Sequence, residues 1–382
     1  MKILSLYTNY CPSVGGIQNV IKNISEYCVR KKHTVSVICF SDTERPSNET
    51  INGVSVFRIK DPYKRRLFGY SIKFKKFYEA NEILFTEADI IHIHGYATLL
   101  SWQTIRFLAD NGFREKIIFN PHYEGIGFSL ANNLLHKIYK KISRSSFSYP
   151  KKIICVSEFE KNKIIKDFGI DKEKIKVIAN GISYEIPNKK TFKKISKDRI
   201  KLIYIGRIKK YKGIQYVFEA IKRLQIEDNY QVVYNIIGEG SYRDQLERLV
   251  QKLELDNINF LGKISDSELK RYLNNSDIFL LISESESYGI VVAEALANNI
   301  FVIVSNTTAL TEFCSEQGCI GVEYPPKIDQ IVNAIKQLVD QGGEIGPFNS
   351  TKIRDWDLAA NEYESEYSNI TQENKNLYGG HQ

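Results

Sequence analysis

Two basic side chains and two carboxylates stand at spacings that suit a diphosphate and the hydroxyls of a sugar. Arg207 and Lys212 lie within Gly206–Gly213, directly after an apolar run and before a helical pattern. Glycine lets a backbone approach a ligand closely, and two cations can neutralise a diphosphate when the protein holds no metal. Glu286 and Glu294 follow later, the second inside the run Val-Val-Ala-Glu-Ala-Leu-Ala. A carboxylate in so apolar a run needs a partner, and the vicinal hydroxyls of a sugar or ribose would supply one.

Glycine turns accompany both groups. Gly238 and Gly240 form a Gly-Glu-Gly turn after the next apolar run, and Tyr288-Gly289 opens the helical pattern that carries Glu294. A single Gly-x-Gly is a weak signal, but this is the second glycine turn expected at the same sheet edge. The backbone amides at a helix start also attract anions. The alternative interpretations are a basic surface loop for the cations and ordinary helix capping for Glu284 and Glu286.

The elements that must position these residues are short apolar runs alternating with amphipathic stretches, a pattern that predicts βαβ units and mostly parallel sheets. In the first half the expected strands are Lys2–Tyr7, Thr34–Phe40, Val54–Ile59, Ile90–His94, Lys116–Asn120 and Ile153–Val156, with helices at Ile17–Lys31 and Trp102–Asn111. In the second half they are Ile200–Ile205, Gln231–Ile237, Ile258–Leu261, Ile278–Ile282 and Phe301–Val304, with helices at Ile214–Leu224, Tyr242–Leu253, Asp266–Leu273 and Gly289–Ala297.

Between the halves lies the lysine-rich stretch Tyr184–Arg199, the best candidate for a linker, and Lys352–Ile370 after the second half has a helical pattern. The sequence therefore predicts two doubly wound domains that face a cleft. Ligands in such sheets bind outside the carboxyl ends of the strands, which is where the glycine turns and charged residues fall.

Composition narrows the class of protein. The 382 residues are 43% hydrophobic and 26% charged, as in soluble globular proteins, and no apolar run is long enough to span a membrane. The apolar start is an expected strand and not a secretory signal. Six cysteines without a CxxC or a disulfide-dense spacing favour a reducing, cytoplasmic compartment.

In their order along the chain, the motifs GR-x4-KG, GEG and E-x7-E closely resemble retaining glycosyltransferases of family 4, which have the GT-B fold. Gly15-Gly16 resembles the family's glycine pair near the donor, and Asn120-Pro-His122 resembles the position of its active-site histidine. Further motifs that match the family are Asp89–Gly95, Val156–Glu158 and Val177–Ile182. The resemblance covers roughly residues 1–360 and is specific for the family but not for the sugar.

Three positions depart from the family's pattern. Gln18 replaces an acidic residue after the glycine pair, and Ser183 stands where the Asn-Gly-hydrophobic-Asp pattern ends in aspartate. The third is Thr307–Leu310, where a glycine-rich turn is expected, and this change is expected to reshape the sugar side of the pocket.

The resemblance implies an α/β, GT-B architecture of two Rossmann-like domains facing a central cleft, with a C-terminal helix that packs back on the N-terminal domain. The expected bounds are 1–185 for the acceptor domain, 186–350 for the nucleotide-sugar domain and 351–382 for the helix and polar tail. It implies transfer of a sugar from a nucleotide-diphosphate sugar with retention of configuration and without a metal or other cofactor.

Within that reaction each candidate residue has an implied role. Arg207 and Lys212 would neutralise the leaving diphosphate, Glu286 and the amides near Tyr288-Gly289 would hold sugar hydroxyls, and Glu294 would hold the ribose. His122 would lie close to the donor sugar. The donor set also includes the glycines Gly15, Gly16, Gly206, Gly238, Gly240 and Gly289.

Other functions are left open or set aside. A nucleotide-sugar 2-epimerase of the same fold and a non-catalytic nucleotide-binding module are the alternatives. A Rossmann dehydrogenase is weaker, because no GxGxxG follows the first strand. Asp355-Trp-Asp357 is a DxD that we interpret as helix capping, and His92 with His94 lacks a third ligand for a zinc site.

Charge is unevenly divided, since residues 1–200 hold 35 basic and 19 acidic side chains, a net +16, and the rest is −8. Basic and aromatic side chains alternate in Lys60–Lys76 and His136–Lys152. Such stretches suit an anionic membrane surface and an acceptor carried on a lipid phosphate. We therefore expect a cytoplasmic protein, peripheral on the inner face of the cell membrane, that binds no nucleic acid; lysine-rich solubility is the alternative.

Overall fold

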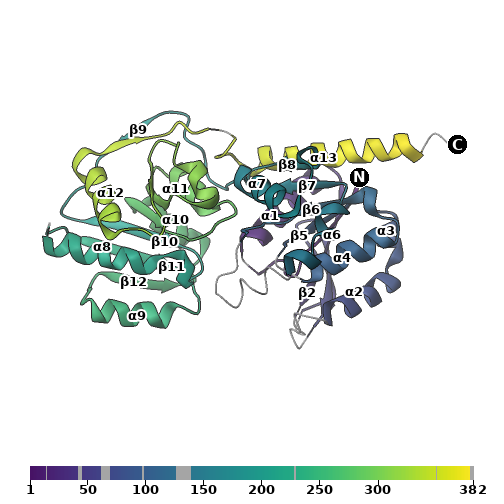
Figure 1. The fold of residues 1–382 in the computed structure, drawn as a ribbon, viewed down its shortest axis with the longest axis horizontal. Helices are drawn as coiled ribbons and strands as arrows, with labels where there is room; N and C mark the ends of the chain where they lie inside the picture. The colour runs from purple at the N-terminus through teal and green to yellow at the C-terminus, as the bar shows by residue number, and fades with distance from the viewer. Residues whose placement is uncertain are drawn as a thin grey trace. The chain divides into compact units, whose positions relative to one another are not determined.

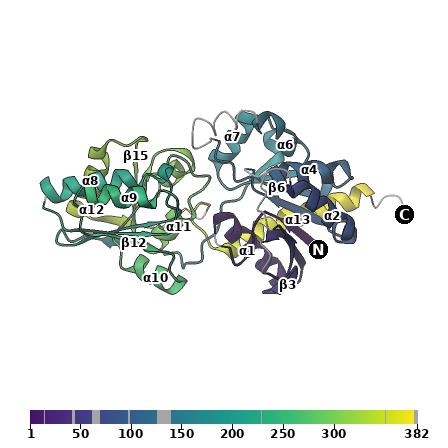
Figure 2. The same cartoon turned by 90° about the horizontal axis from the view of Figure 1, so that it is seen from below.

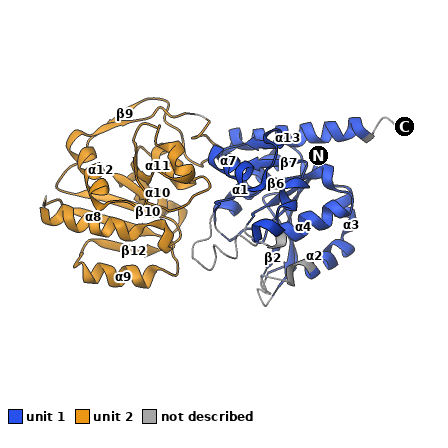
Figure 3. Cartoon of the chain, viewed as in Figure 1, with its two compact units in different colours: residues 1–181, 356–382 blue, residues 182–355 orange. Residues whose placement is uncertain are grey.

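The computed structural model describes residues 1–13, 15–41, 45–61, 69–96, 99–125, 139–227, 229–349 and 351–378 (Figure 1). Contacts divide the chain into two compact units. The first is Met1–Gly181 together with Trp356–Gln382, and the second is Ile182–Asp355 (Figure 3). Residues 182–185 and 351–355 thus belong with the second unit.

The first unit is built on a mostly parallel sheet in the order β3-β4-β2-β1-β5-β6-β7-β8. Its strands are β1 (Lys2–Leu6), β2 (Thr34–Ser41), β3 (Asn48–Ile51), β4 (Val54–Lys60), β5 (Ile90–His94), β6 (Ile117–Asn120), β7 (Lys152–Cys155) and β8 (Ile175–Val177). Only β3 runs antiparallel, because Asn52 (φ 48°) and Gly53 (φ 82°) close a tight hairpin to β4.

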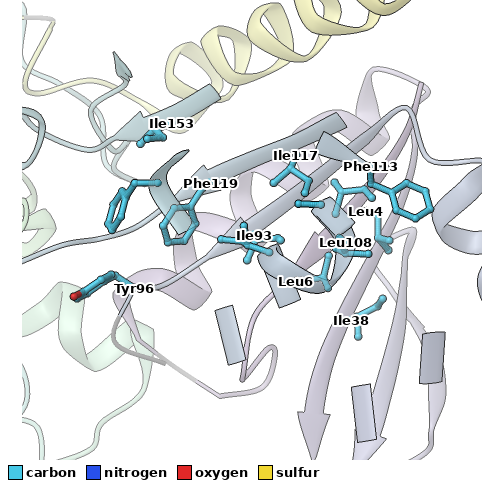
Figure 4. Packing of buried hydrophobic residues seen from close by; sticks show 14 of the residues in the cluster. Leu4, Leu6, Ile38, Ile93, Tyr96, Leu108, Phe113, Ile117, Phe119 and Ile153 are labelled. Atoms are coloured by element: carbon cyan, nitrogen blue, oxygen red, sulfur yellow. The ribbon is translucent and has the colours of Figure 1, made fainter. Parts of the chain in front are cut away.

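Helices cover both faces of this sheet. They are α1 (Gly16–Arg30), α2 (Gly69–Ala80), α3 (Glu82–Thr86), α4 (Leu99–Asp110), α6 (Ser145–Ser148), α7 (Glu158–Phe168) and α13 (Trp356–Tyr378), with 3₁₀ turns at Arg114–Lys116 and Lys172–Lys174. Figure 2 shows α1 and α13 on one face and α4 and α6 on the other. The central strands are buried on both sides, and Leu4, Ile93 and Phe119 lie in the apolar core on one of them (Figure 4).

The C-terminal helix packs on the N-terminal sheet unit, as the resemblance implied. α13 lies along α1, where Tyr27 Oη donates to Asn361 Oδ1 over 3.0 Å and Arg30 pairs with Asp357. The helix begins at Trp356 and ends at Tyr378, so the expected range Lys352–Ile370 was wrong at both ends.

The second unit has a fully parallel sheet in the order β12-β11-β10-β13-β14-β15. Its strands are β10 (Ile200–Ile205), β11 (Val232–Ile237), β12 (Ile258–Gly262), β13 (Ile278–Leu281), β14 (Phe301–Ser305) and β15 (Cys319–Val322). Its helices are α8 (Ile214–Glu227), α9 (Arg243–Lys252), α10 (Asp266–Asn274), α11 (Ile290–Ala297) and α12 (Ile328–Gln341), with 3₁₀ segments Lys210–Lys212 and Thr308–Phe313. The strand order reverses between β10 and β13, which makes the carboxyl edge of these two strands the expected binding position.

The predicted linker is not entirely irregular in structure. It contains β9 (Thr191–Lys193), which pairs antiparallel with β16 (Gly343–Ile345) beside the second sheet. The chain crosses to the second unit earlier, at Ile182, whose amide donates to the carbonyl of Arg354 over 2.9 Å. The lysines that favoured a linker are tolerated because this ribbon is short and partly exposed, and Pro187 lies before the ribbon begins.

Candidate functional site

Three loops meet at the carboxyl edge of the second sheet. The loops after β10 and β11 are joined by the amide of Ile208, which donates to the carbonyl of Glu239 over 2.9 Å. A Cβ on Gly238 (φ 128°) would lie 2.0 Å from the carbonyl oxygen of Gly206, and one on Gly240 would lie 2.0 Å from that of Ile208. These glycines therefore have a structural role, which is to let two loops lie backbone to backbone.

A glycine also allows the loop that follows β13 to pack closely against the loop that follows β10. A Cβ on Gly213 (φ 74°) would lie 1.9 Å from the carbonyl oxygen of Ile282. The amide of Glu284 donates to the carbonyl of Tyr211 over 2.7 Å. The GR-x4-KG segment and the segment that carries Glu286 are thus fixed against each other, although more than seventy residues separate them.

This contact brings Lys212 and Glu286 together. The Lys212 ammonium donates to Glu286 Oε1, and the two side chains are only 10% and 14% exposed. Lys212 is the last residue of the short 3₁₀ segment Lys210–Lys212. Burying an ion pair costs desolvation that roughly cancels its attraction, so stability alone explains this pair poorly.

Arg207 is the exposed member of the cationic pair. Its guanidinium donates from Nη2 to Tyr211 Oη over 3.3 Å, and its carbonyl accepts from Tyr204 Oη over 2.8 Å. Tyr204 is almost fully buried, so the backbone of Arg207 is anchored while its charge stays available to a ligand.

The departure at Thr307–Leu310 has a physical explanation. Thr308 (φ 53°) accepts the amide of Glu286 on its Oγ1 over 3.1 Å, and the amide of Ala309 donates to the carbonyl of Glu286 over 3.3 Å. The hydroxyl of Thr308 holds the Glu286 loop directly, which a glycine at this position would not do.

The helix after this loop is short and starts at a glycine. Gly289 (φ 103°) caps α11, and a Cβ there would lie 2.9 Å from Leu310 Cδ2. Tyr288 is buried and its hydroxyl donates to the carbonyl of Lys352, while burial raises the pKa of that phenol. Tyr288 can therefore offer a ligand its backbone but not its hydroxyl.

Glu294 lies one turn into α11. Within the described part of the chain its carboxylate makes neither an ion pair nor a side-chain hydrogen bond, whereas Lys212 compensates Glu286. Burial, with a smaller contribution from Asp266 on α10, raises the pKa of Glu294 to about 7. Burial raises the pKa of Tyr184 to about 12, with smaller contributions from the carboxylates of Glu294 and Asp266. A half-buried carboxylate without a partner marks a candidate functional group.

The glycine pair of the first unit differs from those of the second. Gly15 caps α1 in extended backbone, and a Cβ there would meet only the mobile end of Gln18, 2.5 Å from Oε1. Among the described residues, no atom would lie within 4 Å of a Cβ on Gly16. The described surroundings therefore do not explain a glycine at either position.

His122 follows β6 with a φ of 50°, which is uncommon outside glycine. Its Nε2 accepts from Asn120 Nδ2 over 3.1 Å, and its ring stacks on His94 with centroids 5.9 Å apart. Burial lowers the pKa of His122 to about 3, so the imidazole is neutral over the ordinary pH range.

Sequence reasoning missed Glu160, which holds this loop in place. Its two carboxylate oxygens accept the amides of Tyr123 (2.6 Å) and Val156 (2.7 Å), and burial raises its pKa to about 8. The only available signal was the Ser157-x-x-Glu160 spacing at the start of α7, where Ser157 caps the amide of Glu160.

The Asp355-Trp-Asp357 motif and the pair His92 and His94 make structural contacts. Asp357 pairs with Arg30 in the first unit, whereas Asp355 belongs to the second unit. His92 is fully buried and its Nδ1 lies 2.7 Å from Tyr367 Oη. Among the described residues, no group of three or more His, Cys, Asp or Glu side chains is arranged to hold a metal.

Known proteins match this chain along nearly its whole length. Residues 14–185 match the family described as Glycosyltransferase Family 4, and residues 185–347 match Glycosyl transferases group 1. The chain belongs to this glycosyltransferase family, and its fold is GT-B.

Two curated relatives and one solved structure illustrate the range of the family. An uncharacterized glycosyltransferase of Methanocaldococcus jannaschii is 27% identical, with 90% of each chain covered. The GPI3 subunit of phosphatidylinositol N-acetylglucosaminyltransferase of Saccharomyces cerevisiae is 24% identical over 95% of this chain and 81% of its own. The structure of HepE from Anabaena in complex with UDP and glucose is similar with a TM-score of 0.67 and 16% identity, covering 99% of both chains.

Proposed function

We propose that this glycosyltransferase moves a sugar from a nucleotide-diphosphate sugar to an acceptor with retention of anomeric configuration and without a metal ion. The observation that supports the proposal is that three groups lie at one edge of the second unit: the exposed Arg207, the Lys212–Glu286 pair and Glu294, which has no cation among the described residues. These groups match the three parts of such a donor: its diphosphate, its sugar hydroxyls and its ribose.

The reaction requires stabilisation of the leaving group. When the glycosidic bond breaks, its electron pair goes to the diphosphate oxygen, where Arg207 and Lys212 oppose the growing negative charge. Before the donor binds, the charge of Lys212 is neutralised by Glu286. In our proposal the Glu286 side chain rotates toward the sugar hydroxyls when the donor binds, which frees the Lys212 charge for the diphosphate. The acceptor oxygen bonds to the anomeric carbon on the face the leaving group departs from, and its proton passes to the leaving phosphate.

We assign the remaining donor contacts to single residues. Glu294 holds the ribose as an ionised carboxylate, and the amides that follow Gly289 at the start of α11 hold sugar hydroxyls. From the first unit, the space that the described residues leave at Gly16 suits close approach by the donor, and we assign the neutral His122 the placing of the donor sugar.

The test is product analysis with a panel of UDP, GDP and ADP sugars, each with and without EDTA. We expect release of the nucleoside diphosphate in EDTA and a product whose anomeric configuration, measured by NMR, matches that of the donor. Strict dependence on Mn²⁺ or Mg²⁺, or an inverted product, would contradict the proposal. Formation of the 2-epimer without any acceptor would identify an epimerase instead.

For the acceptor we propose a saccharide carried on a lipid phosphate or diphosphate at the inner face of the cell membrane. The relative from Saccharomyces cerevisiae carries phosphatidylinositol in its name. On α2 the side chain of Ile72 is 62% exposed beside the exposed Lys75 and Lys76. Residues 62–68 and 136–138 of the two basic stretches lie outside the described residues. Over the described ranges, no helix is long and apolar enough to cross a membrane.

A further inference from the structure

A chain of buried hydrogen bonds connects the C-terminal helix to His122 within the first unit. Tyr363 on α13 donates from its hydroxyl to Asn120 Oδ1 over 3.1 Å, and Asn120 Nδ2 lies 3.1 Å from His122 Nε2. Tyr363 and Asn120 are both fully buried, so neither polar group can exchange its partner for solvent. In sequence the first contact joins residues 243 positions apart.

The donor and acceptor roles of these groups give the series of hydrogen bonds from Tyr363 to His122 a direction. The amide nitrogen of asparagine can only donate, so His122 Nε2 must accept and carry no proton. The neutral ring therefore carries its proton on Nδ1. Because Tyr363 donates to Oδ1, it favours the amide orientation that turns Nδ2 toward His122.

Other contacts fix the backbone of the histidine but not its tautomer. Glu160 accepts amides of the His122 loop, and the ring of His94 stacks on His122. Neither contact engages Nε2. The proton position on His122 thus depends on Asn120, and the hydroxyl of Tyr363 helps to set the orientation of Asn120 together with His92, which also interacts with the Asn120 side chain.

We propose that Tyr363 is a positioning residue that, through Asn120, holds His122 in the tautomer whose Nδ1–H is available to a substrate hydroxyl. This rests on the proposed function, in which His122 places the donor sugar. It gives α13 a role in the reaction beyond covering the N-terminal sheet.

A second tyrosine on the same helix provides a matched control. Tyr367 is one turn further along α13, is equally buried, and its hydroxyl lies 2.7 Å from His92 Nδ1. Tyr363→Phe and Tyr367→Phe each remove one buried hydroxyl and its hydrogen bond, so their losses of stability should be similar. Only the first hydroxyl bonds the amide that donates to His122.

Two readouts test the proposal. In protein with ¹⁵N-labelled histidine, where His122→Gln assigns the His122 signals among the six histidines, the wild type should show the Nδ1–H tautomer. Tyr363→Phe should give a mixture of tautomers and lower kcat about tenfold with little change in donor KM, because the buried Asn120 oxygen loses the hydroxyl of Tyr363 as a donor. Tyr367→Phe should keep the wild-type tautomer and kcat.

An unchanged His122 tautomer in Tyr363→Phe would overturn the proposal, as would equal losses of kcat in the two variants. The nitrogen spectra report the tautomer whether or not a donor sugar is turned over. Failure of the proposed function would appear separately, as wild-type turnover in His122→Gln.

Discussion

At the residue scale, Glu286 and Glu294 differ in their surroundings more than their shared motif indicates. Glu286 has a buried ammonium beside it, whereas the carboxylate of Glu294 has no cation among the described residues and its pKa is raised to about 7 by burial and Asp266. The free enzyme thus binds a proton at Glu294 below neutral pH. A ligand that needs the ionised carboxylate must displace that proton.

The pH dependence of donor binding should report this proton. Above about pH 7 Glu294 is ionised and ready for two ribose hydroxyls; below it, each pH unit weakens binding by up to about tenfold. We expect the affinity for UDP-glucose, or the nucleotide sugar that raises the melting temperature most, to fall about tenfold from pH 8 to pH 6. Calorimetry should show Glu294→Gln binding weakly at all pH values. A pH-independent affinity in the wild type would remove Glu294 from the ribose contact.

Sequence reasoning selected candidate residues that stand in local motifs, and it missed contacts that run across the fold. Arg207, Lys212, Glu286 and Glu294 are recognisable because loop residues and their strands are close in sequence. The link from Tyr363 to Asn120 depends on tertiary packing, for which a single sequence carries no signal.

At the element scale, the glycines of the second unit shape the loops before any ligand arrives. A residue with a side chain would be similarly strained at Gly213 (φ 74°) and at Gly262 (φ 65°). Of these two positions, only Gly213 has a carbonyl oxygen within 2 Å of an added Cβ, and this oxygen belongs to Ile282. Around Gly262 the nearest atom lies 3.8 Å away.

This pair separates backbone strain from loop contact. Gly262→Ala should lower the free energy of unfolding by about 1 kcal/mol, the usual cost of left-handed backbone in alanine. Gly213→Ala should cost about 3 kcal/mol or more, because the β13 loop must also move. Denaturant unfolding measures both, and equal losses would show that the loop contact is unimportant.

The ends of elements were harder to predict than their existence. The helical pattern of the tail stops at Ile370, after which the residues are polar, so periodicity gives no reason to extend the helix. Polar contacts carry it on to Tyr378: Asn374 Nδ2 donates to the carbonyl of Glu115 over 2.9 Å, and Glu373 lies 3.3 Å from Lys151. At its other end the helix begins only at Trp356, which is buried.

At the scale of the whole molecule, the charge asymmetry calls for its own test. Residues 1–200 carry a net +16 and the rest −8. Each Lys or Arg near an anionic membrane surface contributes about 1 kcal/mol at low salt. A surface used for docking should therefore bind anionic vesicles and release them when salt rises.

Liposome co-sedimentation measures this. We expect binding to vesicles containing phosphatidylglycerol, loss of binding in high salt and little binding to phosphatidylcholine alone. Replacing Lys75 and Lys76 on α2 with glutamate should weaken it, whereas the same change at Lys252 of α9 in the second unit should not. Salt-insensitive binding, or none to anionic vesicles, would favour a soluble acceptor.

The central claim is that cations after β10 stabilise the leaving diphosphate. Lys212 is a difficult probe by itself, because its removal leaves Glu286 buried without a partner. Arg207 is exposed, and Lys210 is an equally exposed lysine in the same segment, so substitution of either should leave the fold intact.

The most direct measurement is the steady-state turnover of Arg207→Ala and Lys210→Ala with the preferred nucleotide sugar in EDTA. Removing a preorganised charge from the transition state lowers kcat by about 100-fold or more, and we predict that loss for Arg207→Ala with an unchanged melting temperature. Lys210→Ala should stay within about twofold of the wild type. Turnover of Arg207→Ala equal to that of Lys210→Ala would contradict the assignment of this edge as the diphosphate site.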